Sequence, residues 1–139
     1  MIVVDAGPVL EMLLGTPAGR QAATILGDED VAAPDVVDAE VFHGLVRSYR
    51  ADRLNADELD ERAQLLVAFN IARVPTRDLL DVAQRCLGAL SSYDALYVAL
   101  AVSLNCPMLT VDAGLAATAS SQLGVSVTIL SASRRHPRE

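Results

Sequence analysis

Short apolar runs alternate along the chain with longer segments whose apolar residues recur at helical spacing. The apolar runs predict five short strands, at residues 2–4, 31–35, 71–75, 107–111 and 125–130. The segments between them predict helices at residues 8–15 and 17–27, from Pro34-Asp35 to about Arg50, at 55–69, after Thr76, around Asp94 and after Asp112. Short strands that alternate with helices are typical of an α/β domain with a mainly parallel sheet.

Polar residues at the predicted helix starts support this division into elements. Asn55 and Glu58 have the spacing of a capping box, in which each side chain accepts a hydrogen bond from the other residue's backbone N–H. Thr76 and Ser92 are predicted to cap the helices that follow them.

With 139 residues the chain is long enough for one domain with its own core, which we place at residues 1–131. Residues 132–139 form a basic tail that we expect to be disordered.

Composition narrows the class of protein. Hydrophobic residues make up 52% of the chain and charged residues 21%, which is typical of a soluble globular protein. The amino-terminal sequence lacks the basic region of a signal peptide, and the uncharged runs are too polar for a membrane span, so we expect a cytoplasmic protein. Cys86 and Cys106 lie in apolar surroundings and are expected to be reduced and to serve in packing.

The net charge of −7 comes entirely from the first third of the chain. Residues 1–46 carry eight acidic residues and one arginine, whereas acidic and basic residues balance over residues 47–139. This distribution argues against a protein that coats nucleic acid through nonspecific charge. All eleven basic residues are arginine, so mechanisms that need a lysine ammonium are excluded.

Two aspartates stand out because the segment around them is otherwise uncharged. Between Cys86 and Ser133 the only charged residues are Asp94 and Asp112. Asp112 and Asp5 each follow a predicted strand, and parallel sheets bind ligands at the carboxyl ends of their strands. One interpretation is that these aspartates only cap helices, since each precedes or begins one. Against it, a carboxylate beside an apolar core costs on the order of several kcal/mol unless it is compensated, and this segment contains no basic residue.

Glu40 is a fourth acidic candidate because it lies on a predicted apolar face. Val37, Val41 and Gly44 share that face of the helix at helical spacing. Carboxylates that converge repel one another, and a divalent metal ion among them offsets that repulsion. Mg²⁺ and Mn²⁺ prefer oxygen ligands, so the acidic residues together indicate a site for one of these ions.

Four segments resemble, in order and spacing, the acidic motifs of PIN-domain ribonucleases. They are "MIVVDAGPVLEMLL", "APDVVDAEVFHGLVR", "SSYDALYVALA" and "LTVDAGLA". The resemblance is strongest to the VapC-type toxins of bacterial toxin–antitoxin pairs and covers almost the whole chain. It maps the acidic positions of the family onto Asp5, Glu40, Asp94 and Asp112.

The resemblance implies a single PIN-like domain whose five strands have the order 3-2-1-4-5. It also implies an endoribonuclease that depends on Mg²⁺ or Mn²⁺ and cleaves RNA with a metal-activated water. Asp5 and Asp94 would be the first metal ligands, and Asp112 and Glu40 would hold a second metal or position bound water. The partners that it implies are an RNA substrate, a VapB-type antitoxin and a second copy of the chain in a homodimer.

Arg47, Arg50 and Arg53 recur every three residues and are expected to share one side of a helix and its continuation. They either contact RNA phosphates beside the cut site or form a solvated face that pairs with Asp52 and Asp57.

Two further residues bear on the site. Gly7 stands where many relatives have a small hydroxyl residue, so a side-chain contact to metal-bound water or phosphate is missing. His43 lies one turn from Glu40 and is either a neighbour of the site or a packed or surface histidine.

Three other classes share parts of this pattern. A receiver domain also joins an α/β sheet to an acidic Mg²⁺ pocket, but it uses a lysine and a pair of early acidic residues that this chain lacks. A haloacid-dehalogenase-type phosphatase needs a second aspartate at the position of Gly7. The stronger alternative is a catalytically weak PIN-fold module that acts by binding RNA or a protein partner.

Overall fold

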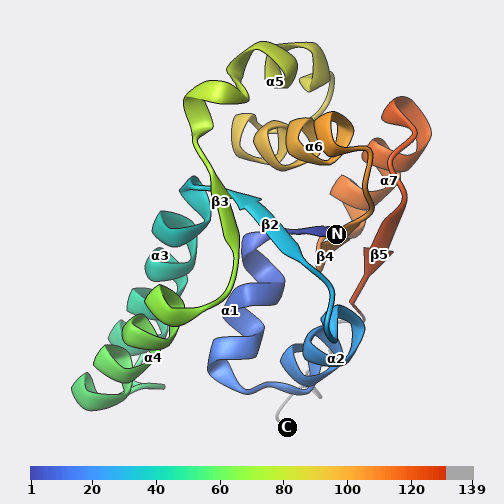
Figure 1. Cartoon of the computed structure of the whole chain (residues 1–139). Helices are drawn as coiled ribbons and strands as arrows, with labels where there is room; N and C mark the ends of the chain where they lie inside the picture. Colours follow the sequence, from blue (N-terminus) through green and yellow to red (C-terminus); the bar gives the residue numbers. More distant parts are fainter. Residues whose placement is uncertain (131–139) are drawn as a thin grey trace, which may run out of the picture.

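The structure, a computed structural model, describes residues 1–130 (Figure 1). Its strands are β1 (Ile2–Val4), β2 (Val31–Pro34), β3 (Ala72–Val74), β4 (Met108–Thr110) and β5 (Val127–Ile129). Its helices are α1 (Ala6–Leu14), α2 (Pro17–Leu26), α3 (Val36–Arg50), α4 (Ala56–Ala68), the 3₁₀ turn η1 (Thr76–Asp78), α5 (Leu80–Cys86), α6 (Ser92–Leu104) and α7 (Ala113–Leu123). Each predicted strand and helix corresponds to one of these elements. Residue 131 and the predicted tail, 132–139, lie outside the described residues.

The strands form one sheet in the order β3-β2-β1-β4-β5, and every neighbouring pair is parallel. The order implied by the resemblance is therefore confirmed, and the sheet of residues 1–130 is parallel throughout. β1 lies at the centre, where Val3 pairs with Ala32 of β2 on one side and with Met108 of β4 on the other. Because β1 and β4 are neighbours that run in the same direction, the residues that follow them, Asp5 and Asp112, lie at the same edge of the sheet.

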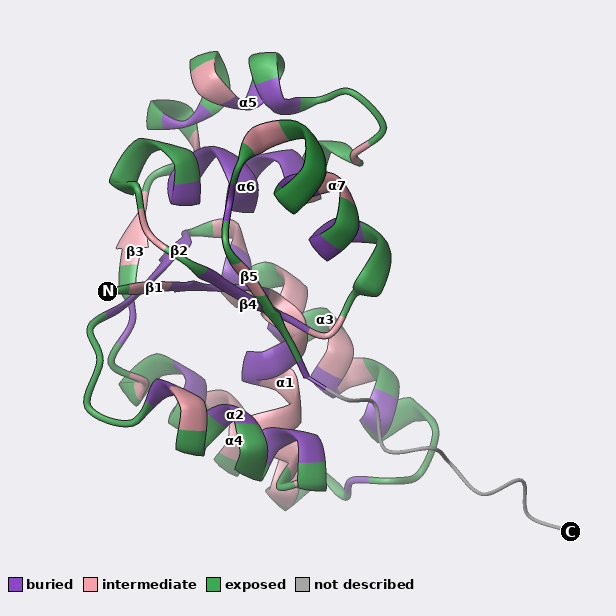
Figure 2. Ribbon diagram, turned by 90° about the vertical axis from the view of Figure 1, so that its right-hand side faces the viewer, coloured by how far each residue is buried: buried purple, intermediate pink, exposed green. Residues whose placement is uncertain are grey.

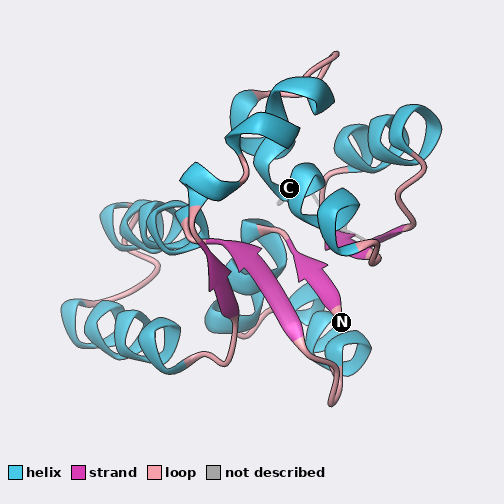
Figure 3. Cartoon of the chain, turned by 45° about the horizontal axis from the view of Figure 1, so that its top comes forward, coloured by secondary structure: helices cyan, strands magenta, loops and turns pink. Residues whose placement is uncertain are grey.

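Helices cover both faces of the sheet (Figures 1 and 3). α5, α6 and α7 lie on one face, where α6 packs against β1 and β2, and α1 to α4 lie on the other, where α1 packs against β4. Residues 3–4 of β1 and residues 95–101 of α6 are buried (Figure 2). Residues 95–101 span about two turns, so this part of α6 is buried on all sides, which explains why it carries no charge. Within residues 1–130, no helix has the length and apolarity that a bilayer span needs.

The starts of two helices differ from the prediction. Ser91, not Ser92, caps α6, because its hydroxyl accepts a hydrogen bond from the backbone N–H of Asp94 at 3.1 Å. Thr76 does not cap an α-helix; it begins η1, and both its backbone N–H and its hydroxyl donate to the Asp35 carboxylate. Parallel pairing of β2 with β3 brings Asp35 beside the end of β3. Thr76 therefore forms its hydrogen bonds with the Asp35 carboxylate and not with the backbone at the start of a helix.

The capping box at the start of α4 forms as predicted. The Asn55 side chain accepts from the backbone N–H of Glu58 at 2.8 Å, and the Glu58 carboxylate accepts from that of Asn55 at 3.1 Å.

Both cysteines are free thiols, and their surroundings fit the predicted role in packing. Cys86 is buried and Cys106 is half-buried. Burial raises the pKa of both thiols, which disfavours the reactive thiolate.

Candidate functional site

Asp5 lies between the end of β1 and the start of α1, and only 9% of its surface is exposed. Its Oδ1 accepts a hydrogen bond from the backbone N–H of Ala6 and its Oδ2 one from the Thr110 hydroxyl, both at 2.8 Å. Burial raises the pKa of Asp5 to about 6, although these two hydrogen bonds lower it. The charges of Asp94 and Glu40 raise the pKa of Asp5 further, so both carboxylates lie close enough to repel it.

Glu40 lies on the inner face of α3, as the apolar stripe predicted. Val37, Val41 and Leu45 on the same helix are fully buried, while Glu40 itself is half-buried. Its Oε1 accepts a hydrogen bond from the Tyr97 hydroxyl at 2.8 Å. Burial raises the pKa of Glu40, the hydrogen bond from Tyr97 opposes this, and the charge of Asp94 adds to it.

Asp94 lies in the first turn of α6, and Ser91 rather than Asp94 caps that helix. Burial raises the pKa of the half-buried Asp94, a hydrogen bond with the Ser91 hydroxyl lowers it, and the charge of Asp112 raises it. The capping interpretation therefore does not account for Asp94.

Asp112 is exposed and does cap a helix. Its Oδ1 accepts from the backbone N–H of Leu115 at 3.0 Å at the start of α7. The capping interpretation is correct for this residue, as it is for Asp5 at the start of α1, but the charge of Asp112 also acts on Asp94. Asp112 thus combines a structural contact with a position beside the other carboxylates.

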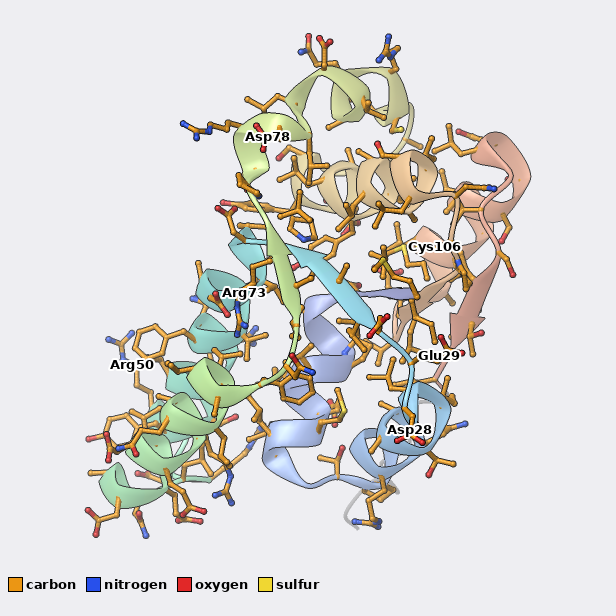
Figure 4. All side chains as sticks on the ribbon, in the orientation of Figure 1. Asp28, Glu29, Arg50, Arg73, Asp78 and Cys106 are labelled. Carbon is orange, nitrogen blue, oxygen red and sulfur yellow. The ribbon has the colours of Figure 1, made fainter. Side chains whose placement is uncertain are left out.

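The four carboxylates gather at the carboxyl edge of the sheet from four separate parts of the chain. Their mutual repulsion links Glu40 to Asp5 and Asp94, and Asp94 to Asp112. Within residues 1–130, no ion pair joins any of them to a basic side chain. Arg73 of β3 (Figure 4), for example, has other partners: it pairs with Asp38 of α3 at 2.9 Å and donates to the Leu66 carbonyl of α4.

The chemistry of these donors fits a hydrated divalent cation. In the described part of the chain, no three His, Cys, Asp or Glu side chains lie close enough to enclose a metal ion between them. Mg²⁺ does not need such a cage, because it keeps several waters and is commonly bound by one or two carboxylates together with substrate phosphates. A set of uncompensated carboxylates that repel one another suits that mode of binding.

Two hydroxyl groups belong to the site although the sequence analysis assigned them no role. Thr110 is fully buried; its hydroxyl donates to Asp5 and also accepts from the backbone N–H of Asp112 at 3.1 Å. Tyr97, also fully buried, donates to Glu40. Their spacing could have marked them, because Thr110 precedes Asp112 by two residues and Tyr97 follows Asp94 by three. Their hydrogen-bond partners, Asp5 and Glu40, are distant in the sequence and could not be inferred from it.

Gly7 is tightly packed. A Cβ atom at this position would lie 2.5 Å from Cγ2 of Val111, well inside van der Waals contact. The Val111 side chain therefore fills the space that a hydroxyl residue would need.

The predicted arginine face is only partly present. α3 ends at Arg50, and the chain turns at Asp52, whose φ is +58°, so Arg53 does not continue the helix. Arg47 and Arg53 nevertheless line one cavity of about 290 Å³ between α1 and α3, and Arg50 is not among its lining residues. Arg50 instead lies at the outer side of α3 (Figure 4).

The alternative role for these arginines, pairing with Asp52 and Asp57, is not found. Within residues 1–130, no ion pair joins the arginines of this segment to either aspartate. His43 is exposed, which agrees with a surface histidine.

A cavity of about 650 Å³ lies far from the carboxylates, at the amino edge of the sheet. Met12, Leu26 and Phe69 line it together with residues 28–30, which directly precede β2. Asp28 and Glu29 of this rim are labelled in Figure 4. This cavity has the size of a ligand pocket. The carboxylates with raised pKa values lie at the opposite, carboxyl edge of the sheet, so we place the functional site at the carboxyl edge.

Comparison with known proteins identifies the family of this chain. A family model described as the PIN domain matches residues 2–120. Ribonuclease VapC9 of Mycobacterium tuberculosis is 36% identical over 127 residues, which are 91% of this chain and 98% of that protein. Ribonuclease VapC12 of the same organism is 37% identical over 121 residues, which are 84% of this chain and 90% of that protein.

Among solved structures, the fold resembles a chain in the crystal structure of VapBC2 from Rickettsia felis bound to a DNA fragment from their promoter. The TM-score is 0.63, and the match covers 94% of this chain and 100% of that chain. At 10% sequence identity this likeness shows the fold alone. The family match and the two sequence relatives go further, and the chain therefore belongs to the PIN-domain family, among relatives of the VapC ribonucleases.

Proposed function

We propose that this protein is a metal-dependent endoribonuclease, the toxin of a type II toxin–antitoxin pair. One observation carries the proposal: four carboxylates from four parts of the chain gather at one edge of the sheet without a basic partner in residues 1–130. Membership of the PIN-domain family and likeness to proteins named ribonucleases support it.

Asp5 and Asp94 are the residues that we assign as direct ligands of Mg²⁺ or Mn²⁺, with Glu40 and Asp112 acting through bound water or a second ion. A divalent ion held by these residues would supply Lewis-acid chemistry, activating water and neutralising phosphate charge. The protein itself holds the carboxylates in place. Asp5 accepts hydrogen bonds from the Thr110 hydroxyl and the Ala6 N–H, and Glu40 accepts one from the Tyr97 hydroxyl.

RNA must approach an acidic site, and nearby arginines offer it contacts. Arg47 and Arg53 line the cavity between α1 and α3, and α3 also carries Glu40. We propose that these two arginines contact phosphates on the flanking RNA, with a weaker contribution from Arg50. Such contacts position the strand without selecting its sequence.

A toxin of this kind needs an inhibitor, and we propose a VapB-type antitoxin as the protein partner. Sequence likeness to proteins named VapC supports this assignment, and the fold also resembles a chain from a VapBC complex bound to promoter DNA. We further propose that the protein forms a homodimer and acts in the cytoplasm, where RNA is available to it.

The test is cleavage of total cellular RNA by purified protein, with new 5′ ends mapped by sequencing. We expect discrete cuts in Mg²⁺ or Mn²⁺, none in EDTA, and none with Asp94→Asn. The matched control is Asp81→Asn, which changes an exposed aspartate on α5 whose charge does not act on Asp5, Glu40 or Asp94, and it should leave the cuts unchanged. RNA binding without cuts by the folded, antitoxin-free protein would instead support the catalytically weak binding module.

A further inference from the structure

Tyr97 links two of the acidic elements of the site. It follows Asp94 by three residues on α6, so both side chains project from the same face of that helix. The Tyr97 side chain is 0% exposed, and its hydroxyl donates to Oε1 of Glu40 on α3 at 2.8 Å. One helix therefore contributes a carboxylate to the site and a hydrogen-bond donor to a second carboxylate.

The phenol is a rigid donor facing a flexible acceptor. A buried aromatic side chain is held in one rotamer by the core around it, whereas glutamate has three rotatable side-chain bonds. A hydrogen bond from a hydroxyl to a carboxylate is short and stronger than one between neutral groups. The contact therefore selects one arrangement of the half-buried Glu40 carboxylate from several.

The phenol also lies within the negative field of the site. Burial raises the pKa of Tyr97, the hydrogen bond to Glu40 raises it again, and the charges of Glu40, Asp5 and Asp94 add to this. Tyr97 thus stays a neutral donor. Unlike an arginine or lysine, it satisfies a carboxylate oxygen without bringing a positive charge that competes with a cation.

We propose that Tyr97 is a positioning residue for Glu40. Its hydroxyl holds Oε1 of Glu40, so that Oε2 of Glu40 is free to contact a bound divalent cation or a water bound to that cation. This inference rests on the proposed function, because it assumes a metal at the carboxylate site. Groups that orient metal-binding side chains typically change metal affinity by about 10- to 100-fold when they are removed.

Binding of Mn²⁺, measured by titration calorimetry or by the EPR signal of free Mn²⁺, tests the inference without any RNA. We expect Tyr97→Phe to bind Mn²⁺ about 10- to 100-fold more weakly than the wild-type chain. The matched control is Tyr93→Phe, which removes an exposed hydroxyl from the same helix and leaves the affinity unchanged. Because Tyr97 acts through Glu40, Glu40→Gln and the double variant Glu40→Gln/Tyr97→Phe should bind Mn²⁺ equally.

The outcomes separate this inference from the proposed function. Wild-type affinity in Tyr97→Phe overturns the inference alone, as does a double variant that binds more weakly than Glu40→Gln. If the wild-type chain binds no Mn²⁺, the proposed metal site and this inference are both overturned.

A second measurement keeps the hydroxyl and does not depend on Tyr97→Phe folding. The chain has three tyrosines, so changing Tyr49 and Tyr93 to phenylalanine leaves Tyr97 as the one site for 3-fluorotyrosine. We expect its ¹⁹F resonance to shift on addition of Mg²⁺, and the shift to vanish when Glu40→Gln is added. A resonance that ignores Mg²⁺, or that moves equally without the Glu40 carboxylate, contradicts the coupling.

Discussion

The carboxylate of Asp5 is held in an environment that favours its protonated form. It is almost completely buried beside the apolar ends of β1 and β4, and its pKa is about 6 where an exposed aspartate has 3.8. The folded protein therefore binds this proton more tightly than the unfolded chain does. Stability from this group is complete below about pH 4 and is lost as the pH rises through about 6.

Replacing Asp5 with asparagine should remove that loss. In EDTA, we expect Asp5→Asn to be more stable than the wild-type chain at pH 7.5, by at most about 3 kcal/mol. The gain is reduced by whatever the asparagine loses in its contacts with Thr110 and the Ala6 N–H. Urea unfolding at pH values from 4 to 8 measures it. Parallel stability curves for the two proteins would show that Asp5 does not titrate as described.

Gly7 offers a second prediction at the scale of one residue. Alanine normally favours a helix over glycine by about 1 kcal/mol, but at Gly7 its Cβ would lie 2.5 Å from Cγ2 of Val111. We expect Gly7→Ala to destabilise the protein by about 1–3 kcal/mol through overpacking.

The same substitution in a Val111→Ala background should be neutral or stabilising, because the clashing methyl group is gone. Thermal unfolding of the four proteins in this cycle measures the change of sign. Destabilisation that persists without the Val111 methyl groups would place the cause elsewhere than in this contact.

At the scale of the element, the start of α6 decides where Asp94 lies. Ser91 accepts the hydrogen bond from the Asp94 N–H, while Ser92 is the first residue of the helix. Loss of a capping hydroxyl costs about 1 kcal/mol and loosens the first turn. The residue that caps the helix thus also anchors the backbone of a proposed metal ligand.

We therefore expect Ser91→Ala to lower the free energy of unfolding by about 1 kcal/mol and to weaken RNA cleavage. Ser92→Ala is the matched control, one residue away, and should change stability by less than about 0.5 kcal/mol. Urea unfolding and the RNA cleavage assay measure both variants. A larger effect from Ser92 than from Ser91 would reinstate the cap predicted from the sequence.

At the scale of the whole molecule, a cation at the carboxylate site should hold the fold together. A ligand that binds only the folded state stabilises it by about 2.7 kcal/mol at one hundred times its Kd. We expect Mn²⁺ to raise the Tm of the wild-type chain and of Asp81→Asn, and to leave that of Asp94→Asn unchanged. Scanning calorimetry with and without EDTA measures this, and an equal rise in all three proteins would indicate binding at other carboxylates.

Most of the fold could be predicted because short strands and amphipathic helices leave periodic patterns in the sequence. The strand order came from the family resemblance rather than from periodicity, and the structure confirms it. The predicted helix caps were wrong where two neighbouring residues could both cap the helix, or where a residue distant in the sequence took the hydrogen bonds. Ser91 and Ser92 can both cap a helix, and Thr76 is held by Asp35, 41 residues before it.

In the candidate site, too, local features could be predicted from the sequence and contacts between distant residues could not. Asp94 and Asp112 were found because the segment around them is otherwise uncharged, Asp5 because it follows a predicted strand, and Glu40 because it lies on an apolar helix face. The structure brings the four together. Tyr97 and Thr110 were not assigned roles, because their hydrogen bonds join residues 57 and 105 positions apart. Such contacts depend on how helices and strands meet in the folded chain.

The most direct test of the metal site is an anomalous difference map from crystals of this protein soaked in Mn²⁺. We expect a peak at the carboxyl edge of the sheet, within bonding distance of carboxylate oxygens of Asp5 and Asp94. A crystal without a peak there, or with Mn²⁺ only at the acidic loop of residues 28–30, would contradict the assignment of these carboxylates as a metal site.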